Sequence, residues 1–160
     1  MHNFIGTVFK VLGISLILML LMDVLLLTVD TITVNNRVES LSLIIRDELS
    51  RNNSIPDDIA DLFDAQLRDI VNSSNVAVDY KWNLHDPIVV DGVTYGPIDS
   101  SHVKDYGEIL GLAIVVTMEP HFTMLLGAES KARGDTFFAR AFFSYDRVYV
   151  YKVPALRYLK

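Results

Sequence analysis

The chain has 160 residues, no cysteine and a formal net charge of −6. The absence of cysteine excludes a disulfide framework and cysteine-ligated metal sites. Phosphate contacts need clustered basic residues, so the acidic balance and the scattered lysines and arginines argue against a nucleic-acid-binding protein. About 110 residues follow the first 50, and this length suits one small domain.

An almost purely apolar run occupies residues 11–29, and residues 4–9 extend its apolar surface towards the N-terminus. As a helix the run is about 28 Å long, enough to cross the hydrocarbon core of a bilayer. A cleaved signal peptide is the alternative. The run is longer than a typical signal core, however, and no A-x-A-like cleavage site follows it. We therefore expect an uncleaved signal anchor.

The charges that flank the run predict its orientation. Lys10 precedes the run, and Asp30 follows it closely. Under the positive-inside rule this places the N-terminus in the cytoplasm. We expect a single-pass protein of the inner or cell membrane whose C-terminal domain lies outside.

Helical periodicity continues beyond the apolar run, with no proline before residue 56. We predict one helix over residues 4–52, with residues 4–29 in a membrane or filament core and an amphipathic second half. The β-branched stretch at 28–34 is where a break is expected first. The apolar stripe of the second half should pack on a sheet face built from residues 109–118 and 137–143. The stripe consists of Val34, Val38, Leu41, Ile45 and Leu49.

A polar Asn52-Asn53-Ser54 sequence ends this pattern and divides the chain into residues 1–53 and a domain of residues 54–160. A second helix is expected from Ser54, which is a suitable N-cap, with Pro56 in the first turn. The aspartates that follow favour the positive end of the helix dipole. Polar residues 72–75 end the second helix.

From residue 76 onwards the period changes to two, which is typical of strands. Asp91-Gly92 is a hairpin signal, because both turn positions require positive φ. The sequence predicts an α+β fold with a four- to six-stranded antiparallel sheet, in which residues 109–119 form a central strand and residues 144–147 a turn. The remaining predicted strands are 76–82, 88–90, 93–95, 122–126, 136–144 and 148–153.

No pattern in the sequence predicts an enzyme. The chain lacks phosphate-binding, dinucleotide-binding and zinc-protease motifs. Its histidines, at positions 2, 85, 102 and 121, do not form a recognisable set with a nucleophile and a carboxylate. We expect no catalytic residue, no bound metal and no cofactor, and we interpret the histidines as surface or strand-end residues.

Asp23 is the exception, since it interrupts the apolar run. A carboxylate in lipid costs a few kcal/mol, and its side chain is too short to reach the membrane surface. We expect it to pair with a cationic group of an adjacent subunit, either Lys10 or the N-terminal amine. Pairing with Lys10 requires two parallel helices offset by about 20 Å. Such a contact would fix the register of an assembly.

An apolar N-terminal helix that continues into an amphipathic half, followed by a short helix and an antiparallel sheet, resembles type IV pilin-like proteins. The closest likeness is to TadE-like pseudopilins. The resemblance implies cleavage by a prepilin peptidase after a glycine, here Gly6, and assembly by an ATPase-driven machine. The acid often found near the new terminus in that family has no counterpart in residues 7–11.

Two hypotheses from different classes follow. In the first, the protein is a structural subunit whose N-terminal helices bundle into the core of a surface filament or pseudopilus, with itself, the membrane and an assembly machine as partners. In the second, it is a single-pass anchored module that binds a partner outside the membrane and does not polymerise. A third, an anchored hydrolase, has no residues to support it.

Overall fold

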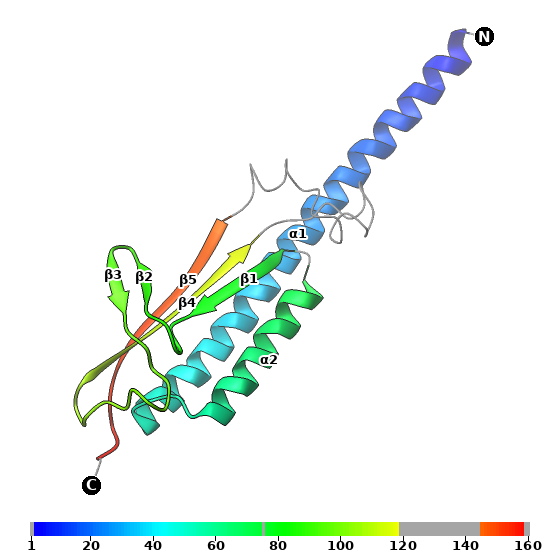
Figure 1. Cartoon of the computed structure of the whole chain (residues 1–160). Coiled ribbons are helices and arrows are strands. Elements are labelled where there is room, and N and C mark those ends of the chain that lie inside the picture. Colours follow the sequence, from blue (N-terminus) through cyan, green and yellow to red (C-terminus); the bar gives the residue numbers. More distant parts are fainter. Residues whose placement is uncertain (1, 75, 119–144, 159–160) are drawn as a thin grey trace.

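The computed structural model describes residues 2–74, 76–118 and 145–158. These residues form a long helix that projects from an α+β domain (Figure 1), so the predicted fold class is confirmed. The elements in chain order are α1 (His2–Asn52), α2 (Asp57–Ser73), β1 (Ala77–Trp82), β2 (Ile88–Val90), β3 (Val93–Tyr95), β4 (Ile109–Met118) and β5 (Tyr145–Pro154).

Helix α1 is continuous over 51 residues, a length of about 76 Å. The predicted unbroken helix is therefore confirmed, including the β-branched stretch at 28–34. Three threonine hydroxyls in that stretch donate to carbonyl oxygens one turn earlier, which satisfies their polar groups inside the helix. Thr28 bonds Val24 at 2.8 Å, Thr31 bonds Leu27 at 2.7 Å and Thr33 bonds Val29 at 2.9 Å.

Asn53 ends α1 in the left-handed region, with φ of 60°, a conformation that asparagine tolerates after a helix. Its fully buried side-chain amide donates to the carbonyl oxygens of Lys104 and Arg157, and its Oδ1 accepts from the N–H of Arg157. The end of α1 is thereby tied both to the loop before β4 and to the segment after β5.

Helix α2 begins at Asp57, three residues later than predicted. Ser54 is not its N-cap. Pro56 occupies the N-cap position in extended conformation, and Ile55 forms a parallel bridge with Asp99 before the helix starts. Because the main chain at 54–55 takes part in this bridge, a helix cannot begin there. The C-terminal end agrees with the prediction.

The five strands lie in two antiparallel sheets rather than one. The larger sheet has the order β1-β4-β5, so β4 is the central strand, as predicted. Strands β2 and β3 form a separate hairpin that contacts β4. The hairpin turns at Asp91 and Gly92, whose φ values of 50° and 78° are those that the Asp-Gly sequence predicts.

The prediction of a turn at residues 144–147 is wrong for residues 145–147, the part of it that the structure describes. Tyr145, Asp146 and Arg147 already belong to β5 and pair with the end of β4. A side-chain bond of 2.8 Å from Thr117 to Asp146 reinforces this pairing. The strands predicted at 122–126 and 136–144 lie outside the described residues.

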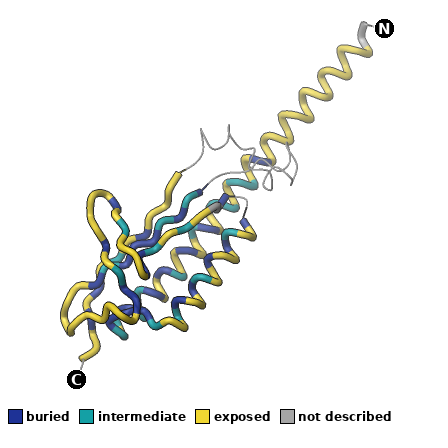
Figure 2. The backbone as a smooth tube through the Cα atoms, in the orientation of Figure 1, coloured by how far each residue is buried: buried dark blue, intermediate teal, exposed yellow. Residues whose placement is uncertain are grey.

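The second half of α1 forms part of the domain core (Figure 2). Val34, Val38, Ile45 and Leu49 are buried in one cluster with β4 side chains such as Leu112, and Leu41 packs against that cluster partly buried. The stripe contacts α2, β4 and β5. The sequence pattern divides the helix from the domain at residue 53, but the two share one core. Residues 137–143, the second segment predicted to pack against the stripe, lie outside the described residues.

Adjacent isoleucines on α1 test this packing. Ile45 is 2% exposed, whereas Ile44, about 100° farther around the helix, is 59% exposed. We expect Ile45→Ala to lower the free energy of unfolding by about 2–5 kcal/mol, because it leaves a cavity in the core. Ile44→Ala should change it by less than about 0.5 kcal/mol. Thermal unfolding of the full chain in detergent measures both, and equal effects would show that the stripe is not the core face.

Candidate functional site

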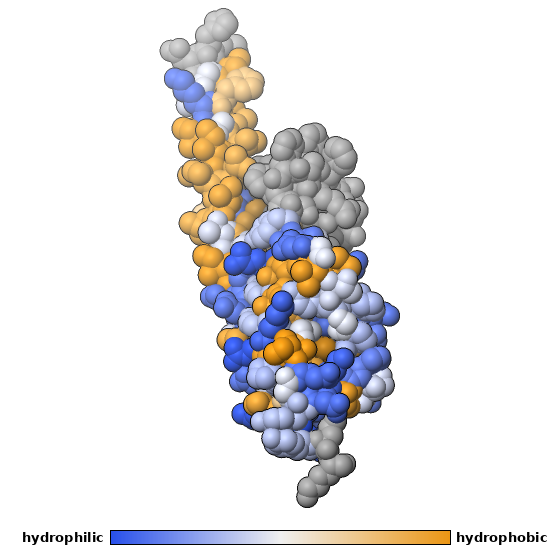
Figure 3. Space-filling model, turned by 90° about the vertical axis from the view of Figure 1, so that its left-hand side faces the viewer, coloured by the Kyte–Doolittle hydropathy of each residue, from blue (hydrophilic) through white to orange (hydrophobic). Residues whose placement is uncertain are grey.

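Residues 4–22 of α1 project beyond the domain, and we call them the projecting segment. Every one of them is exposed, and apolar surface covers most of the face of the segment that Figure 3 shows. Its 19 residues span about 28 Å, close to the thickness of a bilayer core. By length and composition, α1 is a helix that is able to cross a membrane.

Apolar exposure continues past the projecting segment along one face of α1. Leu25, Val29 and Ile32 are all more than half exposed, at spacings of four and three residues. On the other side of the same turns, Leu27 packs partly buried against the domain core. The outward face of α1 therefore stays apolar for about three turns beyond the projecting segment.

Two residues nominated from the sequence, Gly6 and Lys10, lie on the projecting segment. Lys10 is exposed, and nothing lies within 4 Å of where a side chain at Gly6 would begin. Lys10 and Asp23 are 13 residues apart on one straight helix, about 20 Å. Within one chain, then, the two residues predicted to pair across subunits are not in contact.

Asp23 is buried within the single chain. Its residue exposure is 1%, whereas its neighbours Met22 and Val24 are 47% and 50% exposed. It has a polar or electrostatic interaction within the chain. A pairing of Asp23 with Lys10 of another subunit remains a prediction, and it requires the carboxyl group to leave these surroundings first.

Replacement of Asp23 should consequently act on the single subunit. We expect Asp23→Ala to destabilise the full chain in detergent by about 1–3 kcal/mol, because a buried polar contact is lost. Met22→Ala, one residue away and exposed, should change stability by less than about 0.5 kcal/mol. An unchanged unfolding transition in Asp23→Ala would contradict this role within the single chain and would favour a contact between subunits.

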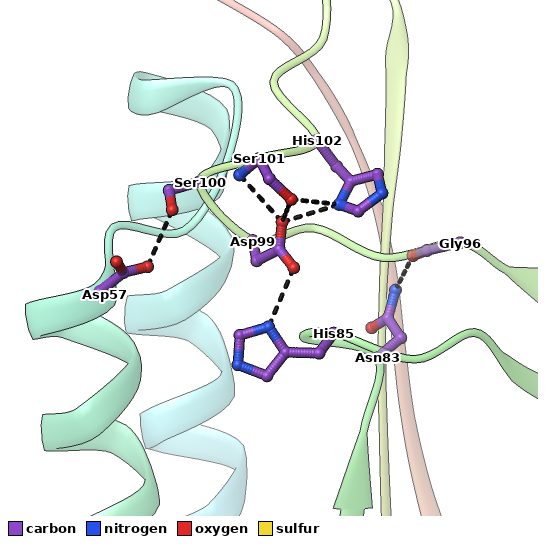
Figure 4. A network of polar contacts seen from close by, with 8 residues as sticks. All are labelled: Asp57, Asn83, His85, Gly96, Asp99, Ser100, Ser101 and His102. Atoms are coloured by element: carbon purple, nitrogen blue, oxygen red, sulfur yellow. Dashed lines mark hydrogen bonds and ion pairs between the residues drawn. The ribbon is translucent and has the colours of Figure 1, made fainter.

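The described residues hold one dense polar cluster, around Asp99 at the far end of the domain (Figure 4). His85 Nδ1 lies 2.9 Å from Asp99 Oδ2, and His102 Nδ1 lies 2.7 Å from Oδ1. Ser101 donates to Oδ1 from both its hydroxyl and its N–H. Ser100 donates to Asp57 at the start of α2, at 2.8 Å. The cluster thus fastens the loop after β3 to the turn after β1 and to α2.

This cluster is not arranged as a catalytic triad. Ser101 Oγ and Asp99 both meet His102 at Nδ1, at 2.9 and 2.7 Å. A proton relay requires the carboxylate and the nucleophile on opposite ring nitrogens. Hydrogen bonds from Ser101, then His102 and His85, hold the pKa of the buried Asp99 well below its usual range. The bond to Asp99 raises the pKa of His85, with help from the charges of Asp57 and Asp86.

Sequence reasoning missed this cluster. It assigned His85 and His102 to the surface separately, because they lie 17 positions apart and their neighbours give no periodic signal. A local signal was present in Asp99-Ser100-Ser101-His102, where an aspartate with following serines is typical of a side-chain-stabilised turn. His85 reaches Asp99 through tertiary structure, and spacing alone does not predict that contact.

The cluster predicts a pH dependence of stability. The pKa of His85 is raised in the folded protein. Its contribution to the free energy of unfolding is therefore complete below about pH 6.5 and is lost as the pH rises through the folded pKa. Asp99 has a lowered pKa, so its contribution is present above about pH 3.9 and is lost as the pH falls towards the folded pKa. His85→Asn should flatten the decline in melting temperature between pH 6 and 8.

The effect should be small, since the His85 side chain is two-thirds exposed and solvent screens its charge. Ser100→Ala, which removes a neighbouring bond without a titrating group, is the matched control and should leave the slope unchanged. The same slope in wild-type and His85→Asn protein would contradict the assignment.

A groove of about 590 Å³ opens beside the cluster, between β3, the loop at 102–104 and the start of β4. Its position depends on Asn83, which is fully buried. The Asn83 amide donates to the carbonyl oxygens of Gly96 and Gly111, and its Oδ1 accepts from Ala113. These bonds hold the chain after β3 against β4 where β1 has ended. Lys104 and Lys152 line the groove.

Within residues 2–74, 76–118 and 145–158, no group of three or more histidine or acidic side chains is placed to hold a metal ion. Comparisons of the chain with protein-family models, with curated proteins and with solved structures found no match. The domain itself does not cover the apolar surface of the projecting segment.

Proposed function

We propose that this protein is a membrane-anchored structural subunit of the pilin-like kind, whose apolar helix packs against the helices of further copies in a filament or pseudopilus. One observation carries the proposal: α1 passes from the exposed projecting segment into the domain core without a break. The domain is fixed to the helix over residues 34–49 and therefore cannot turn independently of it.

A simple anchor does not need this construction. About 20 apolar residues and a flexible linker are sufficient to tether a domain to a membrane. A filament of packed helices needs every domain in the same orientation to its helix, because symmetry repeats one contact many times. The apolar outward face at Leu25, Val29 and Ile32 supports the same proposal, since it offers packing surface above the segment that lipid would cover.

The alternative is a single-pass module that binds a partner and remains unassembled. The groove beside β3, distant from the projecting segment, favours this alternative as a place for a partner. The two functions differ in whether neighbouring α1 helices meet in a fixed orientation.

Cysteine scanning distinguishes them, because the native chain has no cysteine. One cysteine would be fixed at Val11 and a second placed in turn at each position from 15 to 29 except Asp23, because a head-to-tail contact joins different positions of two copies. Each variant would be oxidised as the full chain in its membrane. Packed helices should give disulfide dimers that recur every three or four positions, the period of one helix face. Freely diffusing anchors should give weak crosslinks without a period.

The control is the same set of variants diluted in detergent micelles, where contacts by random collision disappear. Electron microscopy of sheared surface material should show filaments for the wild type. A flat crosslinking profile together with the absence of filaments would overturn the proposed function.

A further inference from the structure

Two lysines, Lys104 and Lys152, line the groove beside β3. Its described lining contains no carboxylate, although the whole chain is acidic. Apolar side chains that the core does not use also line it. Val93, Val103 and Ile109 are each more than 40% exposed. A basic groove with apolar walls fits an apolar side chain flanked by acids.

Helix α2 presents such a surface. Its inward face, with Phe63, Leu67 and Ile70, belongs to the core. Leu62 is 56% exposed and is the one large apolar side chain of α2 that is exposed. Asp58 lies one turn before Leu62 on the same face, and Asp58 and Asp61 are both exposed. Ala65, the next residue along that face, is small enough to allow close approach.

Leu62 and Lys152 belong to different parts of one molecule. Helix α2 lies along β1, whereas Lys152 is on β5, at the opposite edge of the sheet. Both the N-terminal end of α2 and the start of β4 lie towards the end of the molecule away from the N-terminus of α1 (Figure 1). Copies standing side by side in one membrane would therefore have the two surfaces at a similar height.

We propose that the groove binds α2 of a second copy of this chain, with Leu62 between the apolar walls and Asp58 and Asp61 beside Lys104 and Lys152. The inference rests on the proposed function, since it needs copies aligned in one membrane. The contact joins two different surfaces, so each copy can both offer α2 and receive it. Such a head-to-tail interface continues from copy to copy, as a filament requires.

Paired cysteines test the contact in the full chain in its membrane. A chain carrying both Leu62→Cys and Val103→Cys should form a disulfide ladder of dimers, trimers and longer species. Either single variant should form no ladder, because two different surfaces meet. Leu62→Cys with Val89→Cys is the matched control. Val89 is exposed on the same hairpin but outside the groove lining, so this pair should not crosslink.

A charge reversal tests whether attraction between the aspartates of α2 and the lysines of the groove stabilises the contact. Lys152→Glu in the paired-cysteine chain should reduce the ladder about fivefold, and Asp61→Lys in the same chain should restore it. Lys81→Glu, an exposed lysine on β1 outside the groove, should have no effect.

The outcomes separate this inference from the proposed function. Periodic crosslinks along α1 without a ladder between positions 62 and 103 would overturn the docking of α2 and leave the assembly standing. The absence of both would overturn both. A ladder that forms equally well with Val89→Cys, or that Lys152→Glu does not weaken, would also contradict the groove as the binding surface.

Discussion

The packing of residues 34–49 of α1 against the sheet and α2 is the interaction on which the rest of the structure depends. It makes one helix serve both as the central element of a small domain and as the base of an apolar segment about 28 Å long. The amphipathic half of α1 contributes Val34, Val38, Ile45 and Leu49 to the apolar interior of the domain. Loss of this packing would release the helix and remove the fixed relation between segment and domain.

The ends of α1 serve different needs. At the C-terminal end, Asn53 ties the helix to the loop before β4 and to the segment after β5, so α1 is held to the central strand and to one edge strand of the larger sheet. Farther towards the N-terminus, the domain stops covering the helix near Asp23. The exposed segment begins directly there, without a linker, and a membrane at that level would lie against the domain. This geometry suits repeated packing better than free tethering.

Sequence patterns predicted the periodic parts of the fold well. The stripe from Val34 to Leu49, the Asp91-Gly92 turn and the apolar β4 each carry their own period or turn chemistry. The errors arose where tertiary contacts decide. Ser54 has the side chain of an N-cap, yet a bridge from Ile55 to Asp99 delays the helix. The pairing of Asp23 with another subunit stays a prediction, but the burial of Asp23 within the single chain has no signature in the sequence. The Asp99 cluster joins residues from two loops, which spacing does not bring together.

A distance measurement across α1 tests the central claim most directly, namely that a rigid helix fixes the domain to the projecting segment. Spin labels on cysteines at Ser15 and Ile44, both exposed, would be placed in the full chain in lipid nanodiscs. An unbroken helix predicts a narrow distance distribution centred near about 44 Å, because 29 residues each rise about 1.5 Å. A broad distribution, or one centred well below that value, would show a hinge between membrane and domain and would contradict the account.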